Sequence, residues 1–225
     1  MDSPGGAPAG VIEIAWLDAS LDDADWPRGY PDVLHRLSLA RANGPRCRVT
    51  EHDIVAWDWT AQAITLSAES TRRVIDSLPT DGELSDTVRE MMRMHAGLGW
   101  GSAIGLRLHT RGFLVSLNGQ PLYGGVCLEP ASERAVGWPV LRSSIADGRA
   151  VFHVLPVHLP FLLVDPGGPT REITPDMIAP EARADWPMPA VIARHAYGEV
   201  AARFAHVLRD SRLHDAVKAC GIGTT

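Results

Sequence analysis

The stretch Phe113-Leu-Val-Ser-Leu-Asn-Gly-Gln-Pro-Leu-Tyr-Gly-Gly125 decides the fold of this chain. Up to Leu117, apolar side chains alternate with smaller or polar ones, which is the pattern of a half-buried strand. Asn118-Gly119 follows, a dipeptide that tolerates positive φ at both central positions of a type I′ turn. A second strand is expected over residues 120–128. The sequence therefore predicts a β-hairpin in the middle of the chain.

Apolar residues at strand or helix spacing extend this prediction outward from the hairpin. We expect sheet strands within residues 11–17, 47–66, 104–128 and 138–155, and helices near 31–43, 67–78 and 83–96. Ile104–His109 is predicted as a strand with Leu106 and Leu108 on one face. Because the apolar residues change from even to odd numbers before Phe113, a turn or bulge is expected at Thr110–Gly112.

Together these elements predict a single α+β domain, in which an antiparallel-rich sheet has helices on one face and a C-terminal helical appendage. We expect a flexible tail at 1–9, the α+β domain at 10–155, a proline-rich connection at 156–189 and C-terminal helices packed on the domain at 190–225. Proline fixes φ and lacks a backbone donor, so the connection cannot be one long regular element.

Composition and charge narrow the environment in which the chain works. The net charge of −6 argues against nucleic acid and anionic membranes as partners, because both select a basic surface. Three cysteines without a Cys-x-x-Cys spacing favour reduced thiols in a cytoplasmic protein. No stretch approaches the roughly 20 apolar residues of a membrane span, and no signal peptide is predicted. Lys218 is the only lysine among 21 cationic residues, which we attribute to a GC-rich, bacterial genome.

The common phosphate, nucleophile and metal motifs are missing from the sequence. The glycine-rich stretch Gly97–Gly105 follows a predicted helix, whereas a dinucleotide-binding fingerprint follows a strand. Ser102 within that stretch does not stand in a Gly-x-Ser-x-Gly elbow. His153 and His158 are five residues apart in a predicted extended segment, so they should point to opposite faces. We therefore predict neither a metal nor a cofactor.

Two groups of residues are candidates for a dispersed catalytic site. Arg107 and His109 would share one strand face, and with Arg111 nearby they could bind a carboxylate or phosphate. A solvated sheet face is the alternative, and the charge pattern favours it. Cys127 could be a thiol nucleophile with His109 or His153 as its base. A lone cysteine in an apolar strand is more often a small core residue, which is the preferred interpretation.

Aromatic residues provide a different candidate, a surface for binding another protein. Trp57 and Trp59 flank Asp58 at a predicted turn, and Tyr123 lies on the returning strand of the hairpin. An exposed tryptophan is a typical centre of binding energy. Aromatic residues also pair across strands for stability alone. The sequence leaves both interpretations open.

Three segments resemble the extracytoplasmic head of the SecD accessory subunit of the Sec translocase. They are Ile64–Arg72, Gly112–Gly119 and Pro139–Arg149, which in order read as a strand with a capped helix, a hydrophobic strand with a tight turn, and a Pro-Val strand ending in Gly-Arg. The resemblance covers less than half of the chain and contains no catalytic motif. It implies a small α+β layer with helices on one face of a mixed or antiparallel sheet. It does not imply transport, because function does not follow from fold.

Three functional hypotheses follow. The first is a non-catalytic binding or accessory protein, with a protein-interaction surface around Trp57, Trp59 and the hairpin. The second is a small-molecule enzyme with a dispersed site of histidine, arginine and cysteine. The third is an acidic immunity-type inhibitor with a carboxylate patch near Asp18–Asp25. An enzyme predicts convergent polar groups with perturbed pKa values, whereas a binding module predicts an apolar or aromatic patch.

Overall fold

The structure is a computed structural model that describes residues 11–21, 30–95, 103–129, 132, 136, 138–156, 158, 162–163, 171–172 and 204–224. Its strands are β1 (Ile12–Ser20), β2 (Cys47–Thr50), β3 (Ile54–Asp58), β4 (Ala63–Leu66), β5 (Arg111–Leu117), β6 (Gln120–Cys127), β7 (Val140–Ala146), β8 (Arg149–Leu155), β9 (Leu162–Leu163), β10 (Arg171–Glu172) and β11 (Gly223–Thr224). Its α-helices are α1 (Tyr30–Ala42), α2 (Ala68–Asp76), α3 (Asp86–His95), α4 (Ala103–Arg107) and α7 (Ser211–Ala219). Two 3₁₀ turns, η2 (Glu51–Asp53) and η3 (Asp81–Glu83), complete the named elements.

Nine of these strands form one sheet in the order β11-β3-β4-β8-β7-β6-β5-β1-β2, and β9 and β10 pair separately. Most neighbours are antiparallel, whereas β6 pairs in parallel with β7 and β11 with β3. Helices accompany the sheet, so the predicted α+β class with an antiparallel-rich sheet is confirmed.

The β-hairpin predicted in the middle of the chain is present as β5 and β6. β5 and β6 pair from Gly112↔Val126 to Leu117↔Gln120. Asn118 has φ of 50° and Gly119 has φ of 77°, so both central residues of the turn are in the left-handed region, as a type I′ turn requires. Asp147 and Gly148 repeat this geometry between β7 and β8, with φ of 51° and 71°. Two tight turns of the same type therefore set the register of four strands.

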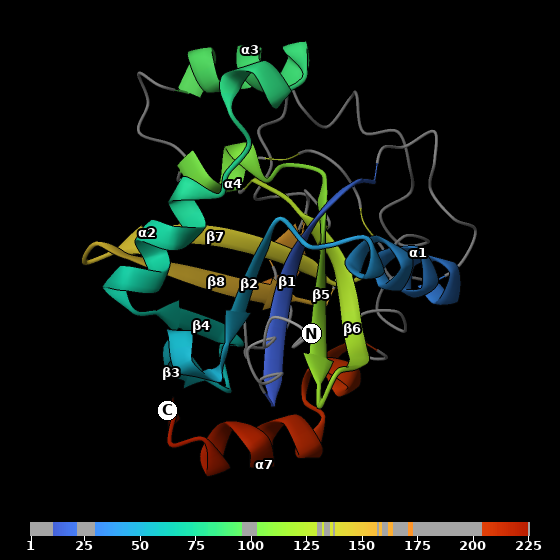
Figure 1. Ribbon diagram of the computed structural model, residues 1–225, viewed down its shortest axis with the longest axis vertical. Helices are drawn as coiled ribbons and strands as arrows, with labels where there is room; N and C mark the ends of the chain where they lie inside the picture. Colours follow the sequence, from blue (N-terminus) through green and yellow to red (C-terminus); the bar gives the residue numbers. More distant parts are fainter. Residues whose placement is uncertain are drawn as a thin grey trace, which may run out of the picture.

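The sheet is strongly coiled. Figure 1 shows β7 and β8 running across the direction of β1, β5 and β6. Trp16 of β1 contacts Phe152 of β8 with ring centroids 4.9 Å apart, although β5, β6 and β7 lie between these strands in the sheet. In a flat sheet the two strands would be about 19 Å apart, at about 4.8 Å per strand. The inner face therefore folds around a single core.

Glycine allows the close approaches that this coiling needs. A Cβ on Gly125 would lie 1.7 Å from the carbonyl oxygen of Pro139, so only glycine lets β6 come this near to the residue that leads into β7. A Cβ on Gly124 would lie 2.8 Å from Cδ1 of Leu37, so helix α1 also depends on the missing side chain. Gly124-Gly125 is therefore the point where β6 meets both α1 and β7.

The helices pack on both faces of the sheet. On β1, Ile14 and Trp16 belong to the main core, whereas Ala15 and Leu17 belong to a second cluster with Leu37 of α1. Because successive strand residues point to opposite faces, these two clusters lie on the inner and the outer face respectively. Helices α2 and α7 contribute to the inner core, and α1 covers the outer face over β1, β5 and β6. This division differs from the expected placement of helices on one face.

The C-terminal segment is part of the main core. Leu213 and Val217 of α7 are fully buried among the inner-face residues, and Ile222 joins them. Asp210 caps α7 by accepting a hydrogen bond from the amide of Arg212 at 2.9 Å. The C-terminal helices at 190–225 were expected to pack on the domain; within this range the structure describes 204–224. The proline-rich connection is described only at 156, 158, 162–163 and 171–172.

The predicted strand at Ile104–His109 is wrong. Residues 103–107 form the short helix α4, and Leu108 to Thr110 turn the chain into β5. Ile104 and Leu108 both reach the inner core. Their spacing of four residues fits one helix face as well as alternate strand positions, so a run this short does not distinguish the two periods. The turn expected at Thr110–Gly112 lies slightly earlier, over Leu108–Thr110, and Thr110 has φ of 66°.

Candidate functional site

A group of polar side chains lies on the outer face of the β7–β8 hairpin. Arg142 of β7 and His153 of β8 are register partners. Their neighbours Leu141 and Phe152 belong to the inner core, so Arg142 and His153 point outward. His158 lies beside Arg142, and Glu129 is near enough to Arg142 to favour the charged form of the guanidinium. We call Glu129, Ser132, Arg142, His153 and His158 the Arg142 cluster.

The hydrogen bonds of the cluster determine the protonation state of His158. Nη2 of Arg142 lies 2.7 Å from Nδ1 of His158, and Nε2 of His158 lies 2.8 Å from the carbonyl oxygen of Ser132. A guanidinium can only donate and a carbonyl can only accept. Nδ1 must therefore be the acceptor, and Nε2 carries the proton. Both contacts thus select the same neutral tautomer of an imidazole that is only 4% exposed.

Arg142 and His153 each hold a buried polar atom that makes no hydrogen bond in the described part of the chain. These atoms are Nε of Arg142 and Nδ1 of His153. Both side chains are half-buried. Burial lowers the pKa of His153, the charge of Arg142 lowers it further, and Asp58 opposes the shift. Burial also lowers the pKa of Arg142, against the attraction of Glu129. The site therefore combines a partly desolvated cation with a neutral imidazole.

The partners of Arg142 differ from those of most other described arginines. Eight of these form ion pairs with carboxylates: Arg41, Arg46, Arg73, Arg89, Arg93, Arg107, Arg111 and Arg212. Arg142 hydrogen-bonds to an imidazole instead. Glu129 acts on it as a nearby charge. Among the described residues, no carboxylate therefore forms an ion pair with the guanidinium of Arg142.

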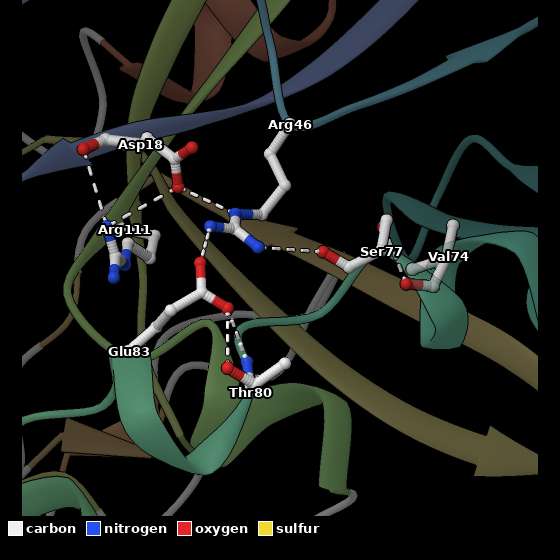
Figure 2. A network of polar contacts seen from close by, with 7 residues as sticks. All are labelled: Asp18, Arg46, Val74, Ser77, Thr80, Glu83 and Arg111. Atoms are coloured by element: carbon white, nitrogen blue, oxygen red, sulfur yellow. Dashed lines mark hydrogen bonds and ion pairs between the residues drawn. The ribbon is translucent and has the colours of Figure 1, made fainter.

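Arg46 shows what a fully paired arginine looks like in this fold (Figure 2). Its Nε donates to Asp18 of β1 at 2.6 Å, its Nη1 donates to the carbonyl oxygen of Ser77 at 3.2 Å, and its Nη2 pairs with Glu83 of η3. Thr80 donates its amide to Glu83 at 2.8 Å as part of a capping box. These bonds lower the pKa of Glu83 to about 2. This network joins β1, the end of α2 and η3, and each nitrogen of the Arg46 guanidinium has a partner in it.

Arg107 and His109 do not form the expected pair on a strand face. Arg107 lies at the end of α4, where it donates to the carbonyl oxygen of Pro79 and pairs with Asp81, both at 2.6 Å. His109 follows in the turn, and its Nδ1 accepts a hydrogen bond from the amide of Glu129 at 3.4 Å. Arg107 is thus paired with η3, whereas His109 lies against the backbone of Glu129, a member of the Arg142 cluster.

Cys127 and His153 lie on opposite faces of the sheet. Cys127 is 2% exposed in the inner core, and burial raises the pKa of its thiol far above the ordinary value. His153 points to the outer face. The pairing of this thiol with His153 as a base is therefore not formed, and Cys127 occupies the position of a small core residue.

The three aromatic residues of the predicted binding surface do not form a common surface: two lie in the core and one packs against the C-terminal helix α7. Trp57 and Tyr123 are fully buried in the inner core, and burial raises the pKa of the Tyr123 phenol. Trp59 is partly buried, and its ring stacks on His214 of α7 at 4.6 Å. Trp57 and Tyr123 therefore have no exposed side chain in this structure, and Trp59 holds α7 against the β3–β4 turn.

Sequence reasoning did not single out Arg142, although a signal was present. A two-residue turn at Asp147-Gly148 pairs residues whose numbers sum to 295, and this places Arg142 opposite His153. The contact with His158 could not be obtained in this way. It arises because the chain beyond β8 returns to pair Val136 with His158 in an isolated antiparallel bridge. That return depends on tertiary structure.

The described residues contain neither a grouped set of metal ligands nor a helix that could span a membrane. No three side chains of His, Cys, Asp or Glu in this part of the chain are grouped so that they could hold a metal ion. No described helix combines the length and the apolar character needed to cross a membrane.

Comparison with known proteins gives no match to a family model, to a curated protein or to a solved structure. The resemblance to the SecD head therefore stays a prediction.

Proposed function

We propose that the protein is a binding protein whose Arg142 cluster recognises an anionic group, a carboxylate or phosphate, on a small molecule. The observation that carries the proposal is the half-buried guanidinium of Arg142. It hydrogen-bonds to an imidazole, whereas eight other described arginines form ion pairs with carboxylates.

Desolvation gives the first physical reason. Moving a charged group out of water costs free energy unless an opposite charge or hydrogen bonds compensate for it. Arg142 is partly removed from water, and its Nε makes no hydrogen bond to the described residues. A bound anion would replace the favourable interactions with water that the Arg142 guanidinium loses on burial. A guanidinium also suits this role because its planar donors match the geometry of carboxylate and phosphate oxygens.

The neighbouring side chains support a polar ligand. Across the outer face, Asp58, Ala63, His153 and Arg142 lie in one row on four adjacent strands. Ala63, which has a small side chain, lies between Asp58 and His153 in this row. Asp58 and Arg142 have opposite charges at the two ends of this row. A ligand with an anionic group and a second polar group would match both.

A small molecule fits these residues better than a protein partner. The centres of protein interfaces are rich in tryptophan, tyrosine and arginine. Of the three aromatic candidates, Trp57 and Tyr123 are inside the core. The exposed large apolar residues of the described chain are single residues on different elements: Val11, Leu39, Val55, Ile75 and Ile145. The original hypothesis of a protein-interaction surface would therefore need Trp59 as its centre.

The proposal is tested by titrating the protein with sulfate, acetate and a panel of small carboxylates and phosphates, with calorimetry as the readout. We expect saturable binding that falls by about 10–100-fold in Arg142→Met, the effect of losing charge-assisted hydrogen bonds worth about 1.5–3 kcal/mol. Arg149→Met is the matched control, because Arg149 is an exposed arginine on the same hairpin. Equal binding by wild type and both variants would rule the site out.

A catalytic role for the same site is the second candidate, and His153 is the observation that favours it. Burial and Arg142 keep its imidazole neutral, and Nδ1 makes no hydrogen bond to the described residues. A neutral imidazole beside a bound anion is a suitable general base. Turnover of a bound ligand that is lost in His153→Gln, with binding retained, would favour the enzyme over the binding protein.

A further inference from the structure

We infer that binding of an anion at the Arg142 cluster is coupled to the uptake of a proton by His158. This inference rests on the proposed function and specifies it further, because it makes the site a receptor for an oxyanion together with a proton.

The hydrogen bonds show why the free site holds His158 neutral. Nδ1 of His158 accepts from the guanidinium of Arg142 at 2.7 Å, and Nε2 donates to the carbonyl oxygen of Ser132 at 2.8 Å. A second proton would have to bind to Nδ1. That would turn the acceptor into a donor and place two cations in direct contact. In the free protein, protonation of His158 therefore requires the loss of its hydrogen bond to Arg142.

The charges around His158 point in the same direction. Arg142 faces it from β7, and His153 lies next to Arg142 on β8. Glu129 beyond β6 acts on Arg142, and Asp58 on β3 acts on His153. Arg142 dominates because it touches the imidazole, and Coulomb energy falls with distance. Burial and the Arg142 charge lower the pKa of His158, against the hydrogen bond to Ser132, which raises it.

An anion reverses this balance. When it binds to Arg142, its negative charge offsets the repulsion between the guanidinium and a protonated imidazole. It can also accept a hydrogen bond from Nδ1. By linkage, a ligand that stabilises the protonated form must bind more tightly as the pH falls. Uptake of one proton corresponds to a rise in affinity of about tenfold per pH unit over the range in which His158 titrates.

The test is the sulfate affinity of the whole protein between pH 8 and pH 5, measured by calorimetry in two buffers with different ionisation enthalpies. Sulfate is chosen because it does not titrate in this range, whereas phosphate does. We expect the affinity to rise as the pH falls, with uptake approaching one proton per sulfate.

His158→Gln is the central variant. A glutamine side chain can accept from Arg142 and donate to the Ser132 carbonyl, but it cannot take up a proton. We expect it to bind sulfate with an affinity that is nearly independent of pH. His153→Gln should keep most of the pH dependence, which separates the two imidazoles. In the free protein, the ¹⁵N shifts of His158 should show a neutral ring with its proton on Nε2, and this measurement does not depend on any variant.

The outcomes distinguish this inference from the proposed function. Sulfate binding that requires Arg142 but does not change with pH overturns the proton coupling and leaves the anion site intact. A pH dependence that persists in His158→Gln overturns the assignment to His158. The absence of sulfate binding at every pH overturns the anion site, and the coupling with it.

Discussion

The two arginine networks at Arg46 and Arg142 use the same side chain for different purposes. Arg46 contacts a carboxylate on β1, a carboxylate on η3 and the backbone after α2, so its charge is paired and each of its three nitrogens donates within the fold. Arg142 contacts one imidazole and keeps a buried Nε unbonded to the described residues. The partners of a buried charge, more than its burial, thus separate a structural arginine from a candidate ligand-binding arginine.

The largest effect is expected on stability, from a change at the close approach of β6 to the start of β7, the strand that carries Arg142. Gly125→Ala places a Cβ 1.7 Å from the Pro139 carbonyl oxygen, so β6 and the start of β7 must separate. We expect a loss of about 3 kcal/mol or more in the free energy of unfolding, measured with urea. Gly82→Ala is the control, because its Cβ would meet nothing within 4 Å. An equal effect of both substitutions would contradict the close approach.

Arg142→Met should separate binding from stability. We expect the affinity for sulfate to fall at least tenfold, while the free energy of unfolding stays the same or rises slightly. The reason is that replacing a half-buried charge without an ion pair by an apolar side chain removes a desolvation cost. Calorimetry and urea unfolding on the same preparation give both quantities. A loss of stability of about 1–2 kcal/mol, the size expected for Arg46→Met, would place Arg142 with the structural arginines.

Arg46→Met should show the opposite pattern. Two ion pairs and one hydrogen bond to the backbone are lost, and the carboxylates of Asp18 and Glu83 are about half exposed. Pairs of this kind contribute modestly, so we expect a loss of about 1–2 kcal/mol in the free energy of unfolding. Sulfate affinity at pH 6 should stay within twofold of wild type. A large loss of affinity would show that sulfate binds at this network.

The smallest effect is the pH dependence of stability, which also distinguishes the two networks. The pKa of His158 is lowered in the folded protein, so below pH 6.5 the unfolded chain binds more protons than the folded chain. Stability from this group is complete above pH 6.5 and decreases as the pH falls, by at most about 1.4 kcal/mol per pH unit. His158→Gln should remove this decrease.

Glu83 should titrate in a separate window. Its pKa is lowered from 4.5 to about 2, so its contribution is present above pH 4.5 and is lost as the pH falls toward 2. Urea unfolding of wild type, His158→Gln and Glu83→Gln across pH 8 to 2.5 measures both windows. A single transition shared by the two variants would contradict the independence of the networks.

Local sequence signals predicted the fold where they specify one geometry. Asn118-Gly119 permits positive φ at two successive residues, and Ser67, a residue type that favours the N-cap position, accepts the amide of Ser70 at 3.0 Å and caps α2. The strand prediction at Ile104–His109 failed because a spacing of four fits two periods. The coiling of the sheet could not be predicted, since it depends on contacts such as that of Trp16 with Phe152.

The candidate site was only partly accessible from the sequence. His153 was recognised, but its expected partner Cys127 lies on the other face, and the pairing with Arg142 follows from the register of the β7–β8 hairpin. The two aromatic candidates Trp57 and Tyr123 are buried, which the sequence did not reveal. Strand periodicity shows which residues share a face of the sheet, but it does not show which face is covered by the rest of the protein. The neutral tautomer of His158 depends on two tertiary hydrogen bonds, and no local pattern encodes them.

An NMR titration with sulfate at pH 6, followed at the Nε–H signals of Arg142 and Arg46, shows whether Arg142 accepts an anion while Arg46 is already paired. We expect the Arg142 signal to shift and saturate with the affinity found by calorimetry, while the Arg46 signal, whose Nε is bonded to Asp18, stays in place. An Arg142 signal that does not move while sulfate binds elsewhere would contradict this expectation.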